Sequence, residues 1–218
     1  MRRRRYLAAS LGLVAPIVGS AGTVAGTSQQ NSSEQETEPD PLTVDGTGAT
    51  VTNEFELEGG VTIVEALHDG DENFIVELVP TDGDLETLLV NAIGEYDGAT
   101  GALAERGTHV LDIDADGSWE LEILQPRATE DEAETLPVEI EGEGSAWDGP
   151  YLFDGLGRSH GTHEGRGNFI VEILPQDGLF SELVFNELDQ FDGETTFNVD
   201  GIGFVTVEAA GPWSIAIE

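Results

Sequence analysis

The sequence predicts an all-β protein built from two tandem antiparallel β-sandwich modules of a jelly-roll-like kind. Three observations predict this fold. Apolar and polar residues alternate with period two, as in the segment from Trp119 to Ile123, where three apolar residues enclose two glutamates. Asp-Gly pairs and single glycines interrupt such segments at hairpin spacing. The second half of the chain also repeats the first.

The repeat is clearest where Asn73–Pro80 recurs as Asn168–Pro175. From Asn73 to Gly98, 12 of 26 residues are identical to those found 95 positions later. Apolar residues at inward positions are retained between the two copies, whereas most outward residues differ. Two copies of one β-sandwich core require this pattern, and seven or so short strands are expected in each copy.

These patterns divide the chain into five segments. The expected order is a twin-arginine-type signal peptide at 1–25, a flexible acidic and Ser/Thr-rich linker at 26–45, β-sandwich module 1 at 46–125, an acidic linker at 126–141, and β-sandwich module 2 at 142–218. The first linker contains one glycosylation sequon, at Asn31.

The N-terminal segment is expected to be an export signal rather than part of the fold. Residues Arg3–Ala8 resemble the twin-arginine export motif, and an apolar stretch from Leu7 to Val18 follows. We expect this segment to be removed, which leaves the mature chain without a membrane span. Retention of the segment as a membrane anchor is the alternative. Either outcome implies a secreted or cell-surface protein.

The charge of the chain excludes nucleic acid as a partner. There are 44 acidic residues against eight arginines and no lysine, which gives a formal net charge of −36. Phosphate binding needs a basic surface, which this chain lacks. Acidity without lysine, combined with an export signal, resembles the secreted proteins of halophilic archaea. This resemblance implies that the carboxylates adapt the protein to concentrated salt.

The sequence offers no recognisable catalytic machinery, and we expect a non-enzymatic protein without a cofactor. There is no Cys or Lys to act as a nucleophile. A pair of carboxylates suited to glycoside hydrolysis remains open, because 44 acids make such pairs unavoidable.

Two sets of acidic and amide residues suggest cation binding. Asp112, Asp114 and Asp116 begin like a calcium loop, but Ile123 stands where the loop needs Glu. An acidic, solvated strand face is the favoured interpretation, and weak binding of Ca²⁺ or another cation is the alternative. Asn91 and Asp97, which recur in the second copy, are predicted to hold turns.

A basic cluster in module 2 breaks the acidic pattern. Arg158, His160, His163 and Arg166 fall within nine residues, where module 1 has the apolar segment 61–67. Ion pairing with neighbouring carboxylates is the favoured interpretation. A contact with a partner or an anion, and a partial metal site, are the alternatives.

Trp147 lies near the start of module 2, close to Tyr151 and outside the predicted core pattern. An exposed pair of this kind stacks on sugar rings in carbohydrate-binding sandwiches. Packing of Trp147 at the interface between the modules is the favoured alternative.

The module pattern resembles small β-sandwich domains that occur in tandem in extracellular prokaryotic proteins, some of them appended to secreted proteases. The resemblance rests on turns and core positions, so it implies architecture and location but no activity. We therefore expect an exported, non-enzymatic interaction protein adapted to high salt, whose partner is an extracellular protein or a polysaccharide. The alternative is a carbohydrate-binding protein or glycosidase that uses Trp147, Tyr151 and nearby carboxylates.

Overall fold

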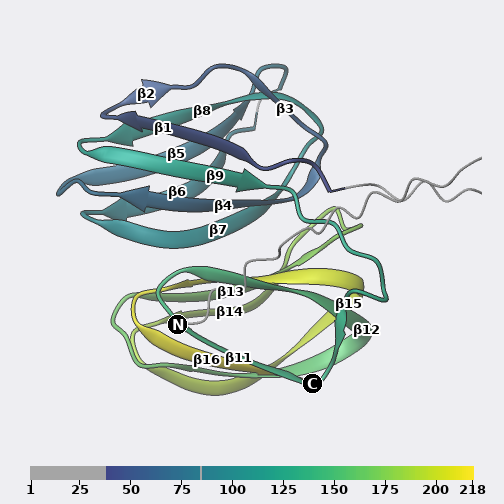
Figure 1. Cartoon of the computed structure of the whole chain (residues 1–218). Helices are drawn as coiled ribbons and strands as arrows, with labels where there is room; N and C mark the ends of the chain where they lie inside the picture. Colours follow the sequence, from purple (N-terminus) through teal and green to yellow (C-terminus); the bar gives the residue numbers. More distant parts are fainter. Residues whose placement is uncertain (1–37, 84) are drawn as a thin grey trace, which may run out of the picture. The chain divides into compact units, whose positions relative to one another are not determined.

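The computed structural model describes residues 38–83 and 85–218, which are all-β and contain no helix (Figure 1). This confirms the predicted fold class. The signal at 1–25, Asn31 and most of the first linker lie outside the described residues. Within the described ranges, no helix is long and apolar enough to cross a membrane.

The first module is a jelly roll of two facing sheets. One sheet has the strand order β1-β9-β4-β7 and the other β2-β8-β5-β6, with β3 beside β2 on the edge of β8. Most successive strands therefore lie in opposite sheets, and the hairpin β5–β6 and the neighbours β2 and β3 are the exceptions. This strand order is that of a jelly roll. The bounds are β1 (Leu42–Thr47), β2 (Thr50–Val51), β3 (Phe55–Leu57), β4 (Gly60–His68), β5 (Asn73–Pro80), β6 (Thr87–Ile93), β7 (Tyr96–Ala104), β8 (Gly107–Ala115) and β9 (Ser118–Leu124).

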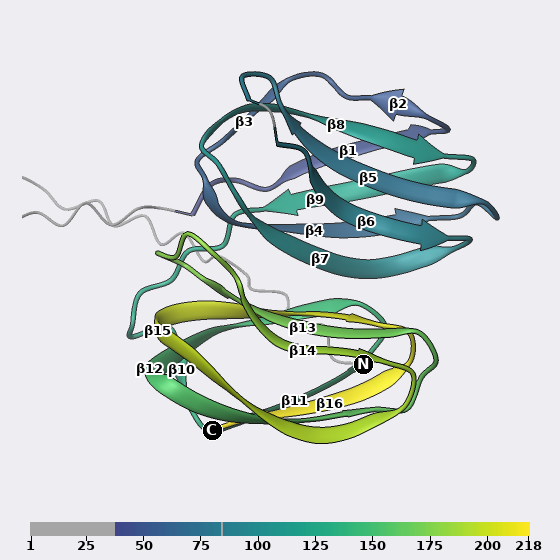
Figure 2. The same cartoon turned by 180° about the vertical axis from the view of Figure 1, so that it is seen from behind.

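The second module has the same strand order, but two of its strands pass through both sheets (Figure 2). The path is therefore continuous: β11-β16-β12-β15-β13-β14. A short strand, β10, pairs in parallel with β12. The bounds are β10 (Glu134–Thr135), β11 (Val138–Glu143), β12 (Ala146–His163), β13 (Asn168–Pro175), β14 (Glu182–Leu188), β15 (Phe191–Ala209) and β16 (Pro212–Ile217).

Glycines with positive φ mark where the long strands change sheets. Gly155 (φ 79°) divides β12, and Gly201 (φ 87°) divides β15. Residues with a Cβ rarely adopt this conformation, so glycine permits the bend without ending the strand. At the corresponding places in the first module, around Gly60 and Gly107, the strands are interrupted. Registers match across the copies: His68 pairs with Tyr96, and His163 with Phe191.

Each module closes its core with a tryptophan against a glycine. Trp119 and Trp213 are buried, and their indole N–H groups donate to the carbonyls of Gly48 and Gly144 at 3.0 and 2.8 Å. A Cβ at Gly46 would lie 2.3 Å from the indole Cζ2 of Trp119. The equivalent Cβ at Gly142 would lie 2.5 Å from Trp213. The retained Gly-x-Gly segments therefore make room for the indole rings.

A third apolar cluster joins the two modules, and the described residues belong to one compact unit. Val61 and Ile63 of β4 pack there against Leu174 of β13 and Phe204 of β15. Val64 and Ala66, on the opposite face of β4, belong to the core of the first module. Strand β4 is therefore buried on both faces, which explains its nearly continuous apolar sequence.

Candidate functional site

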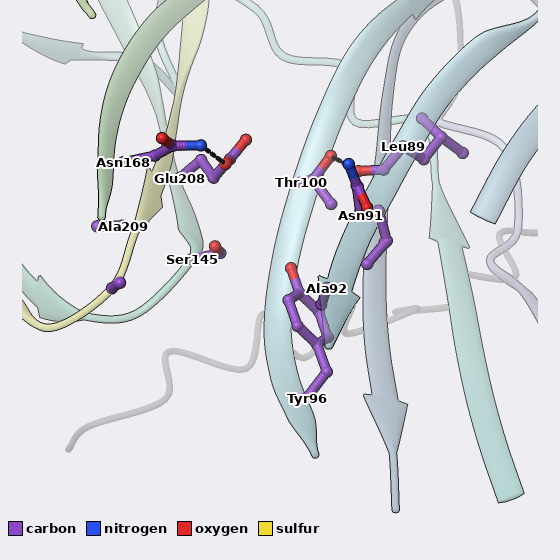
Figure 3. A pocket seen from close by; sticks show the side chains of 11 residues that line it. Leu89, Asn91, Ala92, Tyr96, Thr100, Ser145, Asn168, Glu208 and Ala209 are labelled. Carbon is purple, nitrogen blue, oxygen red and sulfur yellow. Dashed lines mark hydrogen bonds between the residues drawn. The ribbon is translucent and has the colours of Figure 1, made fainter. Parts of the chain in front are cut away.

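A polar cleft of about 230 Å³ lies where the two modules meet (Figure 3). The first module contributes strands β6 and β7, and the second contributes β13, β15 and the turn before β12. The lining residues are Leu89, Val90, Asn91, Ala92, Tyr96 and Thr100 of the first module, with Ser145, Asn168, Glu208, Ala209 and Ala210 of the second.

A β-bulge directs Asn91 toward solvent at the cleft. The register between β5 and β6 shifts at Val76/Glu77, so that Leu89 and Val90 are both buried in succession. After this shift Asn91 is exposed. Bulges often redirect a side chain next to a binding site. Figure 3 shows Asn91 and Tyr96 on one side of the cleft, with Asn168 and Glu208 on the other.

Hydrogen bonds fix the polar groups on both sides. Asn168 Nδ2 donates to Glu208 Oε1 at 2.8 Å, and the Thr100 hydroxyl donates to the Leu89 carbonyl at 2.7 Å. The two modules are linked directly, because the Ala99 amide donates to the Ser145 carbonyl at 3.0 Å. The cleft is therefore a consequence of docking and would not exist in either module alone.

The hydroxyl of Tyr96 remains protonated over the ordinary pH range. Burial raises the pKa of this phenol above its usual value of 10.0, the hydrogen bond with Ser145 lowers it, and the negative charges of Glu208 and Asp97 raise it. The net shift is upward. Tyr96 consequently offers a neutral hydroxyl to the cleft beside the carboxylate of Glu208.

This set of groups suits a neutral ligand rich in hydroxyl groups. Amides and hydroxyls both donate and accept hydrogen bonds, whereas a carboxylate accepts only. No protein-family model and no curated protein matches this chain. The chemistry of the cleft must therefore be inferred from its own residues. Glu208 is the one carboxylate among the residues that line the cleft.

Trp147 and Tyr151 do not form an open stacking surface for a sugar ring. Trp147 packs at the interface between the modules with its ring centroid 6.2 Å from that of Phe204, and its indole N–H donates to Glu65 Oε1 at 3.0 Å. Tyr151 is 4% exposed, and its hydroxyl donates to Asp148 Oδ1 at 2.9 Å. The contacts of Trp147 agree with the favoured interpretation, packing at the interface between the modules, and burial of Tyr151 argues against the alternative of sugar stacking.

The three aspartates of the calcium-loop candidate do not converge. Asp112 and Asp114 lie on the exposed face of β8, and Asp116 follows the strand. The carboxylate of Asp116 instead accepts hydrogen bonds from the backbone N–H groups of Asp71 and Glu72, at 3.2 and 3.1 Å. Its carboxylate thereby holds the turn between β4 and β5. In the described part of the chain, no group of three His, Cys, Asp or Glu side chains is arranged to hold a metal ion.

We expect the carboxyl group of Asp116 to make the free energy of unfolding depend on pH. Hydrogen bonding from the Glu72 amide chiefly lowers the pKa of this carboxyl, with the Asp71 amide and His68 acting in the same direction. A lowered pKa contributes stability above the unfolded-state value of about 4, and this contribution is lost as the pH falls through the folded-state value. Asp116→Asn should therefore lower the free energy of unfolding at pH 7 and have a smaller effect below pH 4.

Chemical denaturation in molar salt between pH 3 and 7 measures this dependence. Asp114→Asn is the matched control, because Asp114 is an exposed acid on β8, two residues before Asp116, and the amides of Asp71 and Glu72 donate to Asp116 instead. A pH-independent difference between Asp116→Asn and the wild type would contradict the expected linkage.

The predicted basic cluster separates into two parts. Strand β12 places Arg158 and His160 on an exposed face, where Glu194 and Glu218 lie beside them, and His160 Nε2 is 2.9 Å from Asp192 Oδ1. His163 is only 2% exposed, stacks on Phe169 and donates from Nδ1 to the Asp189 carbonyl at 2.6 Å. The four residues therefore do not form one surface site. Arg166 is exposed in the turn after β12.

The contrast between the modules explains why basic residues replace an apolar strand. The β4 residues Val61, Ile63 and Glu65 face the second module, and their positions in β12 are taken by Leu156, Arg158 and His160. That face of β12 is exposed. Val61 and Ile63 are therefore apolar on the covered face, whereas Arg158 takes the place of Ile63 on the exposed face and Leu156 is itself exposed.

Sequence reasoning missed Tyr96 and Glu208 as site residues and assigned Asn91 to a turn, with a repeated cation site as the alternative. The repeat contains one usable signal. Glu208 occupies the outward position of Asp114, so an acid is retained there while Asp112 is replaced by Thr206. The cleft itself has no sequence signature, because its two sides belong to different modules.

Proposed function

We propose that this chain is an exported, non-enzymatic binding protein of the cell surface or extracellular space that works in concentrated salt. The observation that supports this proposal is the polar cleft between the docked jelly rolls. Four hydrogen-bonding side chains from both modules meet there: Asn91, Tyr96, Asn168 and Glu208. The two modules therefore act as one binding unit.

The ligand that this cleft fits best is a neutral polysaccharide. Neighbouring hydroxyl groups of a sugar can donate to Glu208 and exchange hydrogen bonds with the two amides. Glu208 and the net charge of −36 disfavour an anionic ligand. This proposal retains a polysaccharide as partner, but it moves the site from Trp147 and Tyr151 to the cleft.

Export is the second part of the proposal. Arg3–Ala8 and the apolar stretch that follows support a twin-arginine route, and the acidity supports a destination in brine. Fractionation of the source cells into cytoplasm, envelope and medium tests this part. Recovery of the protein only from the cytoplasm would overturn it.

A binding screen in molar salt tests the cleft. Glu208→Gln replaces an acceptor oxygen by a donor amide, and a hydrogen bond to a charged group contributes about 1.5–3 kcal/mol. We expect affinity for the neutral polysaccharide that binds wild type to fall at least ~10-fold, because ~1.4 kcal/mol corresponds to tenfold. Asn91→Ala should weaken binding in the same direction.

Asp114→Asn is the matched control for this screen. Asp114 takes the place of Glu208 in the first module, is exposed, and lies outside the cleft lining. Its affinity should equal that of the wild type. Failure of every neutral polysaccharide to bind wild type, or equal loss in the control, would reject the cleft as a saccharide site.

A further inference from the structure

The chain that leaves the first module does not cross to the second as a free tether. It leaves β9 after Leu124, and its next residues, 125–128, are called the linker strap here. Gln125 is only 5% exposed, and Arg127 is half-buried. Flexible linkers rich in Gly and Ser behave as random coils, whereas the strap buries its side chains against the protein.

Gln125 and Arg127 fix the strap to the turn before β4 in the first module. Gln125 Oε1 accepts a hydrogen bond from the Glu58 amide at 2.9 Å, and Gln125 Nε2 donates to the Gly59 carbonyl at 3.3 Å. The guanidinium of Arg127 donates to the same carbonyl. A Cβ at Gly60 would lie 3.2 Å from Arg127 Nη2, so glycine at this position leaves room for the guanidinium.

Gln176 fixes the end of the strap to the second module. Its Oε1 accepts a hydrogen bond from the Ala128 amide at 2.8 Å, and its Nε2 donates to the Ala128 carbonyl at 3.1 Å. One side-chain amide thus pairs with both backbone groups of a single residue. Gln176 follows β13, whose Leu174 packs in the cluster that joins the modules. Consecutive residues of the strap, Arg127 and Ala128, are therefore bonded to different modules.

The first module shows that the sheet itself does not need a glutamine at this position. Thr81 takes the place of Gln176 there. The backbone N–H of Thr81 donates to the Thr108 carbonyl at 2.9 Å, and that of Gln176 donates to the Ile202 carbonyl at 2.8 Å. The Thr81 hydroxyl donates to the Thr108 carbonyl as well. The backbone contact is thus the same in both copies, and the longer side chain of Gln176 serves the strap.

We propose that Gln176 is a positioning residue for the cleft, because it holds the strap and thereby sets the orientation in which the modules meet. This inference rests on the function proposed above for the cleft. The cleft is lined by both modules, so its width follows their relative orientation. Apolar contact in the cluster around Phe204 is non-directional, whereas the hydrogen bonds of the strap have defined directions. The strap therefore preorganises the cleft for its ligand.

Distances between spin labels measure the orientation of the modules without a saccharide. The chain has no Cys, so Ile93→Cys and Leu188→Cys place one label on each module, at side chains that are 80% and 67% exposed. In molar salt the labelled full-length protein should give one narrow distance distribution. Gln176→Thr, which introduces the residue of the first module, should broaden this distribution. Gln176→Glu keeps the acceptor for the Ala128 amide and should give an intermediate width.

Thr81→Ala is the matched control for the distance measurement. It removes a side-chain hydrogen bond at the equivalent position, but this bond lies within the first module and not on the strap. Its distance distribution should equal that of the protein without this change. Circular dichroism checks that each variant retains its sheets. An unchanged distribution in Gln176→Thr would overturn the proposal, and so would equal broadening in Thr81→Ala.

The affinity of the unlabelled proteins for the polysaccharide tests the consequence for the cleft. Gln176→Thr should weaken binding at least ~5-fold, since the loss of one net hydrogen bond corresponds to a factor of roughly 2–10 and two are lost. Thr81→Ala should bind like the wild type. A broadened distribution with unchanged affinity would also overturn the positioning role. A wild type that binds no polysaccharide would reject the proposed function instead, and the distances alone would then decide whether Gln176 orients the modules.

Discussion

Transfer of the protein from molar to millimolar salt should unfold it. Without Arg2–Arg5 the chain carries four arginines against 44 acids, so its net charge is 4 − 44 = −40. The Debye length is about 3 Å at 1 M salt and about 30 Å at 0.01 M, so repulsion between surface carboxylates acts across the whole molecule only at low salt.

The sheets contain specific sources of this repulsion. Four pairs of acids stand directly opposite one another on neighbouring strands, and like charges in this position destabilise a sheet. The pairs are Asp45 with Glu120, Glu65 with Glu122, Glu77 with Asp112, and Asp154 with Asp200. Screening by salt should weaken each of these repulsions.

Far-UV circular dichroism across a salt titration measures the transition. The variant Glu120→Gln, which removes one repulsive pair, should shift the unfolding midpoint to lower salt. The matched variant Glu141→Gln changes an acid that stands opposite Ser214, and it should shift the midpoint less. Native circular dichroism at millimolar salt would contradict the proposed adaptation to brine.

The fold could be predicted from the sequence because its signals are local. Alternation with period two defined the strands, and the offset of 95 residues defined the two modules. The same alternation also explains why the basic cluster separates. Arg158 and His160 are two residues apart and share a face, whereas His163 is an odd number of residues from both and lies on the other face. On a strand, residues that are close in sequence do not necessarily lie on the same face, so their proximity did not predict a shared site.

The docking of the modules could not be predicted from these signals. The apolar segment 61–67 was compatible with an ordinary core strand, and only the structure shows that Val61 and Ile63 face a second module. The cleft depends on the same docking, since Asn91 and Glu208 lie on different modules. The passage of β12 through both sheets could not be predicted from the sequence for a different reason. Gly155, where the strand bends, is also the residue type expected at a turn.

Phe204→Ala should strongly destabilise the protein and uncouple its modules. Phe204 is 1% exposed and packs with Ile63 and Leu174 in the cluster that joins the two jelly rolls. Truncation of a buried Phe costs about 3–5 kcal/mol, because apolar burial is lost and a cavity remains. Val110 occupies the equivalent position in the first module and is only half-buried, so Val110→Ala serves as the matched control with a much smaller expected effect.

Differential scanning calorimetry in molar salt measures the loss of stability, and small-angle scattering measures the separation of the modules. The wild type should unfold in one transition, because each module covers an apolar face of the other. Phe204→Ala should separate that transition into two and increase the radius of gyration, while each sheet core remains intact. The cleft should open at the same time, so polysaccharide binding should fall although none of its hydrogen-bonding groups has changed. A single transition at the wild-type temperature would show that the interface contributes little to stability.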